Sequence, residues 1–199
     1  MWNEQIIMML LEGIKDTLYM TLTSTLIGYV IGLPMGILLT VTDKDGIHPN
    51  AAVYKVLDVI ANLIRSVPFL ILLIVLIPFT RFLIGRSYGP TATIVPLVIA
   101  AAPYIARMVE SSLKEVDAGV IEAARSMGAS NFTIVTKVML VEARTSLIVG
   151  ATISLGTILG YSAMAGTVGG GGLGDIAIRY GYTRSVSYTH LRAHETTLH

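Results

Sequence analysis

Three glycines late in the sequence have a spacing that can bind phosphate. Gly169, Gly171 and Gly174 match GxGxxG, which cradles a pyrophosphate when a strand precedes it and a helix follows. A long apolar stretch precedes these glycines and no alternation of strands and helices surrounds them, so we do not expect a dinucleotide site. We expect the glycines instead to let the chain turn sharply after an apolar helix.

No other set of residues is suited to catalysis or metal binding. The sequence has no Gly-Lys dipeptide, hence no GxxxxGK[ST] phosphate loop, and the chain cannot be its own P-loop ATPase. His48 is the only histidine before residue 185, which leaves no Ser/His/Asp set. His190 and His194 could hold a metal on one helix face, but Glu195 follows the second histidine and no HExxH motif forms. With cysteine absent as well, we predict no catalytic residue, no cofactor and no metal.

The composition places the chain in a lipid bilayer. Hydrophobic residues make up 53% of the 199 residues and charged residues only 14%, where soluble domains carry roughly 25%. The mean hydropathy is +0.71. The formal net charge of +1 gives no footprint for nucleic acid. The sequence therefore predicts a membrane protein and argues against a soluble enzyme.

Four apolar stretches are long enough to cross a bilayer as helices, which predicts an all-α polytopic membrane protein. These predicted spans cover residues 17–42, 59–80, 87–106 and 145–168. Residues 1–16 are predicted to form an N-terminal interfacial segment, and 107–144 is the only long polar stretch between spans. The distribution of Lys and Arg puts 107–144 in the cytoplasm and the N-terminus outside. In this topology Arg65 lies at the cytoplasmic edge of its span, where a long side chain can snorkel.

Glycines in the first predicted span have helix-packing spacing. Gly28, Gly32 and Gly36 form GxxxGxxxG, which lets another helix backbone approach closely. We favour packing within the chain over a dimer seam for this face. Pro34, in the same turn, is expected to kink the helix.

The polar stretch contains a short helix with small side chains on one face. Residues 117–130 read DAGVIEAARSMGAS. Glu122 and Arg125 are expected to form an i, i+3 ion pair, and Gly128 to permit the turn that ends the helix. Ala123 and Ala124 suit close packing. The segment is either a helix that enters a partner's groove or a solvated interfacial helix.

At these residues the sequence resembles the membrane subunits of type I ABC importers. Their signature, EAA-x3-G-x9-I-x-L-P, is matched from Glu122 to Val141, with Val138 at the Ile position and Val141 at the Pro position. The stretches RSVPF at 65–69, PYIARMVE at 103–110 and GYSAMAGTVGGGGLGDIAIRYGY at 160–182 are similar to the methionine-import permeases. The resemblance identifies residues 17–184 as an ABC transmembrane type-1 permease domain.

The resemblance implies five spans, of which four are visible here. Residues 185–199, SVSYTHLRAHETTLH, differ abruptly in composition and resemble a translated sequencing adapter. We therefore expect a non-native tail there and a native sequence truncated near Arg184. The fifth span would follow Tyr182.

The family also implies partners and functional residues. It implies a homodimer in the bacterial cytoplasmic membrane, two cytoplasmic ATP-binding subunits and an external methionine-binding lipoprotein. The ATPase-coupling residues are predicted to be Glu122, Ala123, Ala124, Arg125 and Gly128. The last predicted span carries rare polar groups among small residues, and there the translocation pathway is predicted to be lined by Tyr161, Ser162 and Met164.

Three alternatives stay open on sequence grounds. The same type of ABC importer could transport another amino acid or a small organic acid. An ATPase-independent secondary transporter would need ion-coupling carboxylates inside the spans, and none occurs in residues 17–42, 66–80, 87–106 and 145–174. The chain could also be a purely structural subunit. In that case deletion of its gene would leave uptake unchanged, whereas deletion of a permease gene would abolish uptake.

Overall fold

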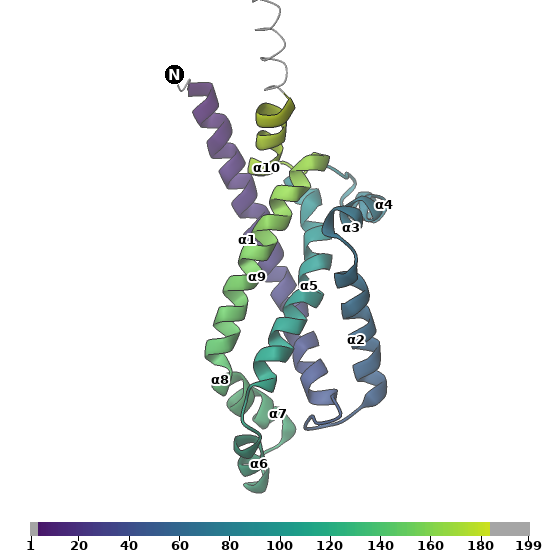
Figure 1. Ribbon diagram of the computed structural model, residues 1–199, viewed down its shortest axis with the longest axis vertical. Coiled ribbons are helices and arrows are strands. Elements are labelled where there is room, and N and C mark those ends of the chain that lie inside the picture. Colours follow the sequence, from purple (N-terminus) through teal and green to yellow (C-terminus); the bar gives the residue numbers. More distant parts are fainter. Residues whose placement is uncertain (1–3, 184–199) are drawn as a thin grey trace, which may run out of the picture.

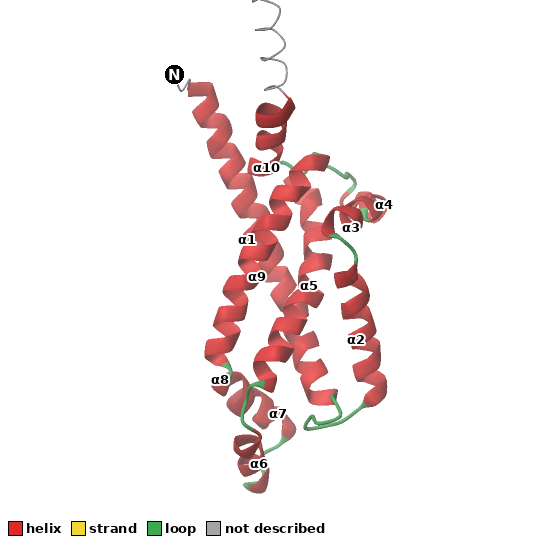
Figure 2. Cartoon of the chain, viewed as in Figure 1, coloured by secondary structure: helices red, strands yellow, loops and turns green. Residues whose placement is uncertain are grey.

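The computed structural model describes residues 4–183, and all regular elements in this range are helical (Figure 2). The predicted all-α membrane fold is thereby confirmed. The tail predicted at 185–199, with His190 and His194, lies outside the described residues. The elements, in chain order, are α1 (Glu4–Thr42), α2 (Ala51–Ser66), α3 (Phe69–Val75), α4 (Ile77–Ile84), α5 (Pro90–Lys114), α6 (Ala118–Ser126), α7 (Asn131–Thr133), the π-helical η1 (Ile134–Met139), α8 (Leu140–Glu142), α9 (Arg144–Ala165), the 3-10 turn η2 (Gly166–Val168), α10 (Gly172–Ile176) and the π-helical η3 (Ala177–Thr183).

Helix α5 is the centre of the bundle, with α1, α2 and α9 packed around it (Figure 1). It is the most deeply buried of the three helices that are long and apolar enough to cross a membrane. Its core side chains include Leu97, Ile105 and Val109. A helix can be buried over most of its surface in this way only when other helices surround it.

The glycine face of α1 packs against α5. A methyl group placed on Gly32 would lie 2.6 Å from the carbonyl oxygen of Ala102, and one on Gly36 would lie 2.5 Å from that of Ala106. Glycine is therefore needed at both positions for the two backbones to approach. The prediction of packing within the chain is confirmed. Helix α1 is one continuous helix that also includes residues 4–16 of the predicted interfacial segment.

The predicted span at 59–80 is wrong as a single helix. In the structure α2 ends at Ser66 and α3 begins at Phe69, with 101° between the two axes. Pro68 lacks an amide donor and forces the residue before it into an extended conformation, which Val67 adopts with φ −85° and ψ 124°. The described residues thus contain three long candidate spans, or four if this bent pair crosses as one.

The start of α2 also changes where Arg65 lies. Helix α2 begins at Ala51, at the end of the bundle that carries α6, and runs toward the opposite end (Figure 1). At about 1.5 Å per residue, Arg65 lies about 21 Å along the helix from Ala51. The sequence stretch before Val59 is helical as well, so Arg65 lies at the end of α2 that points away from α6 and not at the start of a helix. Arg65 lies at the bend between α2 and α3.

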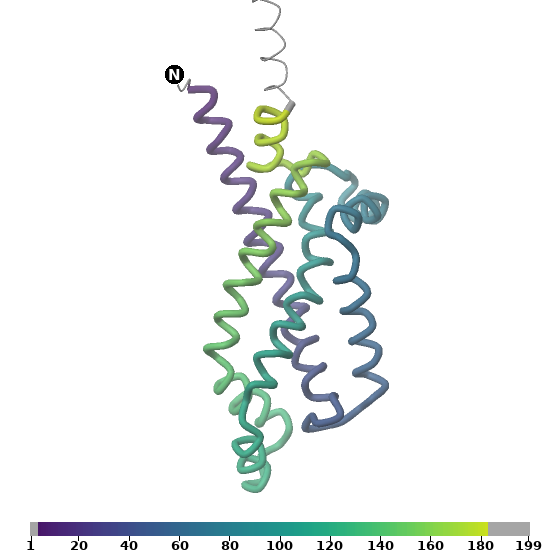
Figure 3. The backbone as a smooth tube through the Cα atoms, viewed as in Figure 1, coloured from purple at the N-terminus to yellow at the C-terminus, as the bar shows by residue number. Residues whose placement is uncertain are grey.

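The glycine-rich segment forms the sharp turn predicted from the sequence. Gly169, Gly171 and Gly172 have φ of +79°, +83° and +74°, values that side chains with a Cβ rarely adopt. The chain then enters α10, whose Leu173 amide donates to Thr17 Oγ1 of α1 over 2.9 Å. The beginning of α1 and the α10–η3 segment consequently lie at the same end of the bundle (Figure 3).

Candidate functional site

Helix α6 lies at the far end of the bundle, beyond the last turn of α5 and the first turn of α9 (Figure 1). The Asp117 carboxylate caps it by accepting from the Gly119 amide over 2.7 Å. Gly128, with φ +79°, allows the turn after it, and its amide donates to the Arg125 carbonyl over 3.0 Å. The helix and its end are those that the sequence predicted.

The predicted coupling residues point in two directions. Ala124 is 5% exposed and belongs to the same core cluster as Ile134 and Met139. Glu122 and Ala123 are exposed, as are Arg125 and Gly128. Ala124 therefore packs the helix against the rest of the chain, whereas Glu122 and Ala123 are exposed to solvent.

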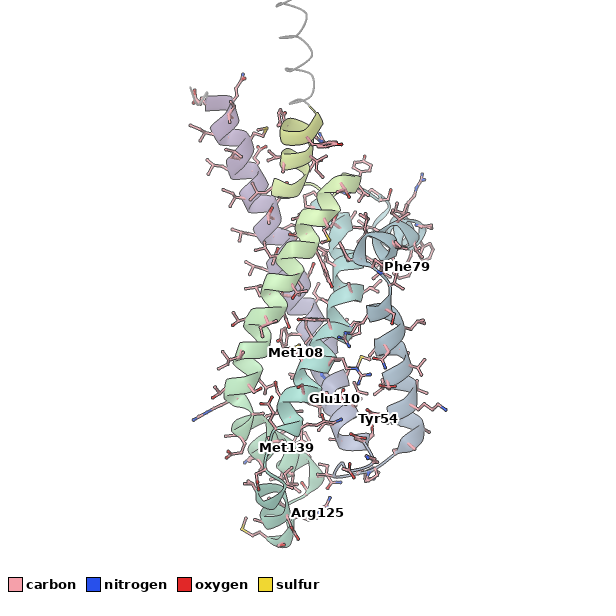
Figure 4. The ribbon with its side chains drawn as sticks, viewed as in Figure 1. Tyr54, Phe79, Met108, Glu110, Arg125 and Met139 are labelled. Carbon is pink, nitrogen blue, oxygen red and sulfur yellow. The ribbon has the colours of Figure 1, made fainter. Side chains whose placement is uncertain are left out.

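The expected ion pair between Glu122 and Arg125 is wrong. Among the described residues Arg125 has no ion pair with Glu122, and its guanidinium donates to the Ile47 carbonyl over 2.7 Å. Ile47 lies in the loop 43–50 between α1 and α2, which the sequence separates widely from α6. The long side chain thus connects α6 to this loop. Figure 4 labels Arg125 at the α6 end of the bundle.

A cavity of about 880 Å³ lies beside this contact. The loop 43–50, the end of α5 and helix α6 form its walls. Charged side chains of both signs line it, among them Lys44, Asp45, Lys114, Glu122 and Arg125. The end of the bundle at α6 is therefore hollow and charged, which is a surface suited to a polar partner.

A network of charged side chains joins three helices just inside this end, and sequence reasoning missed it. Glu110 accepts from Arg107 over 2.6 Å and from Lys114 over 2.8 Å. Lys114 also pairs with Asp43 over 2.7 Å, and Arg107 pairs with Asp58 of α2. The i, i+3 and i, i+4 spacing of Arg107, Glu110 and Lys114 was the only sequence signal. The contacts to Asp43 and Asp58 depend on the tertiary fold.

The network is partly shielded from solvent. Glu110 is buried between α5 and α2 (Figure 4), and the Lys114 ammonium lies 5.9 Å from the ring centroid of Tyr54. The hydrogen bond from Lys114 lowers the pKa of the Asp43 carboxyl below its ordinary value, and partial burial opposes this shift only in part. Asp43 is therefore held ionised where α1 ends.

The three predicted pathway residues do not share a face of α9. The Tyr161 ring stacks on Phe69 of α3, with centroids 4.5 Å apart and planes 7° apart. Ser162 is 1% exposed; its hydroxyl donates to the Leu159 carbonyl over 2.8 Å and faces Thr21 of α1. Met164 is half exposed. In this conformation Ser162 lines no accessible surface, whereas Tyr161 and Met164 each reach one.

The described residues form a helical membrane bundle with a short exposed helix at one end. Comparison with known proteins relates this chain to membrane transport subunits. The chain matches the model of the family described as binding-protein-dependent transport system inner membrane component, over residues 12–190. It is 48% identical to the probable D-methionine transport system permease protein MetI of Vibrio cholerae, across 88% of this chain and 78% of that protein. With the D-methionine transport system permease protein MetI of Escherichia coli K12 it shares 52% identity, across 82% of this chain and 76% of that protein.

A solved structure has the same fold. A chain from a structure described as inward facing conformations of the MetNI methionine ABC transporter superimposes with a TM-score of 0.90 and 50% identity, covering 92% of this chain and 85% of that one. The chain belongs to the family of binding-protein-dependent transport system inner membrane components. It is a multi-pass inner-membrane permease subunit of an ABC transport system and not an enzyme, as the EAA signature predicted.

Proposed function

We propose that this permease carries methionine into the cell, as the membrane subunit of an ATP-driven importer. The support is the identity of about half the residues with D-methionine permeases over most of both chains. The TM-score of 0.90 with a chain of a methionine ABC transporter supports it further. The permease performs no bond chemistry, and it offers a route whose access alternates between the two sides of the membrane.

The single structural observation that carries the coupling mechanism is the position of α6. Its exposed Glu122 and Ala123 would enter a groove of a cytoplasmic ATPase subunit. Its buried Ala124 and the Arg125 contact with Ile47 would pass the resulting motion to α1 and α5. A short helix can transmit a rigid-body motion only if it is anchored to the body it moves, and these two contacts anchor it.

The complete transporter, in this proposal, is a homodimer of the permease on two ATP-binding subunits, supplied by an external methionine-binding lipoprotein. The α6 end faces the cytoplasm. Helix α1 begins at the opposite end of the bundle, so the N-terminus lies outside (Figure 1). Tyr161 and Met164 reach the pathway from α9. Ser162, which is buried against α1, holds that helix in place.

Uptake of radiolabelled methionine tests the proposal. The permease, its ATPase and its binding protein are expressed together in cells that lack methionine uptake, and several other amino acids serve as competing cargo. We expect uptake that requires ATP and that unlabelled methionine, but no other amino acid, competes away. Equal competition by a different amino acid would refute the substrate assignment. Uptake that survives loss of the ATPase would refute the importer mechanism.

A further inference from the structure

A second cavity lies at the bend between α2 and α3, away from α6. Its volume is about 160 Å³, which is below the roughly 300 Å³ of pockets for drug-sized ligands. It therefore suits a molecule of amino-acid size. Its walls come from α2, α3, α5 and α9, four segments that only the tertiary fold brings together.

Arg65 supplies the only charge in the lining of this cavity. No ion pair or hydrogen bond of its guanidinium occurs among the described residues. Arg65 lies in the last turn of α2, at the bend that leads into α3, and its side chain is exposed. An exposed guanidinium that lines a cavity and has no protein partner there can bind a carboxylate through paired hydrogen bonds.

The remaining walls are aromatic and apolar. Tyr161 and Phe69 form the stacked pair, and Leu72 lines the cavity beside them. Tyr104 of α5 brings a phenol hydroxyl, which accepts from Thr157 over 3.4 Å. A guanidinium binds a carboxylate through paired hydrogen bonds, while aromatic rings hold a thioether or an aliphatic chain.

We propose that this cavity is a substrate-contact site, in which Arg65 binds the carboxylate of the transported amino acid and the Phe69–Tyr161 pair receives its side chain. The inference rests on the proposed import of methionine. The break in the helix at Val67 and Pro68 opens the cavity beside Arg65, in keeping with the interrupted helices at transporter binding sites. Arg65 is the only cation among the residues that line the cavity, so it is the residue there that can pair with a carboxylate.

A cysteine placed in the cavity reports occupancy directly, because the chain has no cysteine of its own. The experiment uses the permease–ATPase complex in lipid vesicles, with Leu72→Cys and a maleimide label. We expect methionine at millimolar concentration to slow labelling at least threefold, and methioninamide, which lacks the carboxylate, to leave it unchanged. A cysteine at Tyr88, which is exposed and outside the cavity, is the matched control and should label at one rate throughout.

Arg65 is tested in the Leu72→Cys background. Arg65→Gln should abolish protection by methionine, and Arg65→Lys, which keeps the charge, should retain part of it. Arg86→Gln removes an exposed arginine outside the cavity and should keep full protection. A role of Arg65 in folding alone would leave protection in the assembled Arg65→Gln complex intact, and that result would overturn the proposal.

Methionine uptake by the wild-type complex in the same vesicles distinguishes failure of the cavity assignment from failure of the proposed import function. Uptake without protection of Leu72→Cys would overturn the cavity assignment and leave the import function standing. Absence of methionine uptake by the wild-type complex would overturn the proposed function itself. Protection by methioninamide equal to that by methionine would overturn the role of Arg65 as the carboxylate ligand.

Discussion

Glu110 and Lys114, one turn apart on α5, hold their charged atoms 2.8 Å from each other, and Glu110 is 5% exposed. Through its second oxygen Glu110 also pairs with Arg107, so one carboxylate balances two cations where α1, α2 and α5 meet. A buried ion pair adds little stability over an apolar replacement, yet removal of one partner leaves an uncompensated charge. The network therefore specifies how these helices fit together.

Glu110→Gln should destabilise the permease strongly. Arg107 and Lys114 would keep their pairs with Asp58 and Asp43 but lose the carboxylate between them, and a hydrogen bond to a charged group contributes about 1.5–3 kcal/mol. Thermal unfolding of the purified complex in detergent measures the effect. Glu115→Gln, on an exposed residue without an ion pair among the described residues, is the control and should shift the midpoint little. Equal midpoints for the two variants would contradict the prediction.

Gly36→Ala should loosen the packing of α1 on α5. The new methyl group would meet the Ala106 carbonyl, and backbone cannot rotate away as a side chain can. Overpacking of this kind costs about 1–3 kcal/mol. Gly156→Ala, on an exposed face of α9 with nothing within 4 Å, should gain up to about 1 kcal/mol from helix propensity. If both substitutions shifted the unfolding midpoint in the same direction, the tight contact between Gly36 and the Ala106 carbonyl would be contradicted.

Ala123→Asp and Ala124→Asp should fail for different reasons, although the residues are neighbours. Ala123 is exposed, so a carboxylate there should block assembly with the ATPase while the permease keeps its thermal stability. Ala124 is buried, so a carboxylate there should destabilise the packing of α6 against the rest of the permease. Co-purification with the ATPase and unfolding of the isolated permease distinguish the two. An Ala123→Asp permease that assembles normally would remove α6 as the coupling surface.

Stability should fall in acid through Asp43. The pKa of its carboxyl is lowered by the hydrogen bond from Lys114, so the folded state binds the proton less tightly than the unfolded chain does. The stabilisation is therefore full above the ordinary aspartate pKa and is lost as the pH falls through the lowered value. Asp43→Asn should flatten this part of the profile of unfolding midpoint against pH. An unchanged slope in the variant would show that the Lys114 contact carries no stability.

The sequence by itself determined the class of molecule and its local features. Apolar stretches without charge predicted membrane helices. Glycine spacing predicted the face of α1 that another helix can approach closely and the turn after α9, because glycine's missing side chain is a property of the sequence itself. The Glu122-Ala123-Ala124 signature identified the transport family. The sequence also predicted where α6 ends, since Gly128 adopts a positive φ that few other residues tolerate.

Only the tertiary structure decided which side chains meet. Arg125 was expected to bind Glu122 on its own helix, yet it reaches the Ile47 carbonyl, because the folded chain places the loop 43–50 beside α6. Arg65 was expected near the start of a span, yet it lies at the end of α2, at the bend with α3, for a similar reason. Hydropathy locates apolar segments, but it cannot show that a polar lead-in is helical or that Pro68 turns the chain by 101°. The sequence shows that a face can pack closely, but which distant segment meets it is decided by the packing of the whole chain.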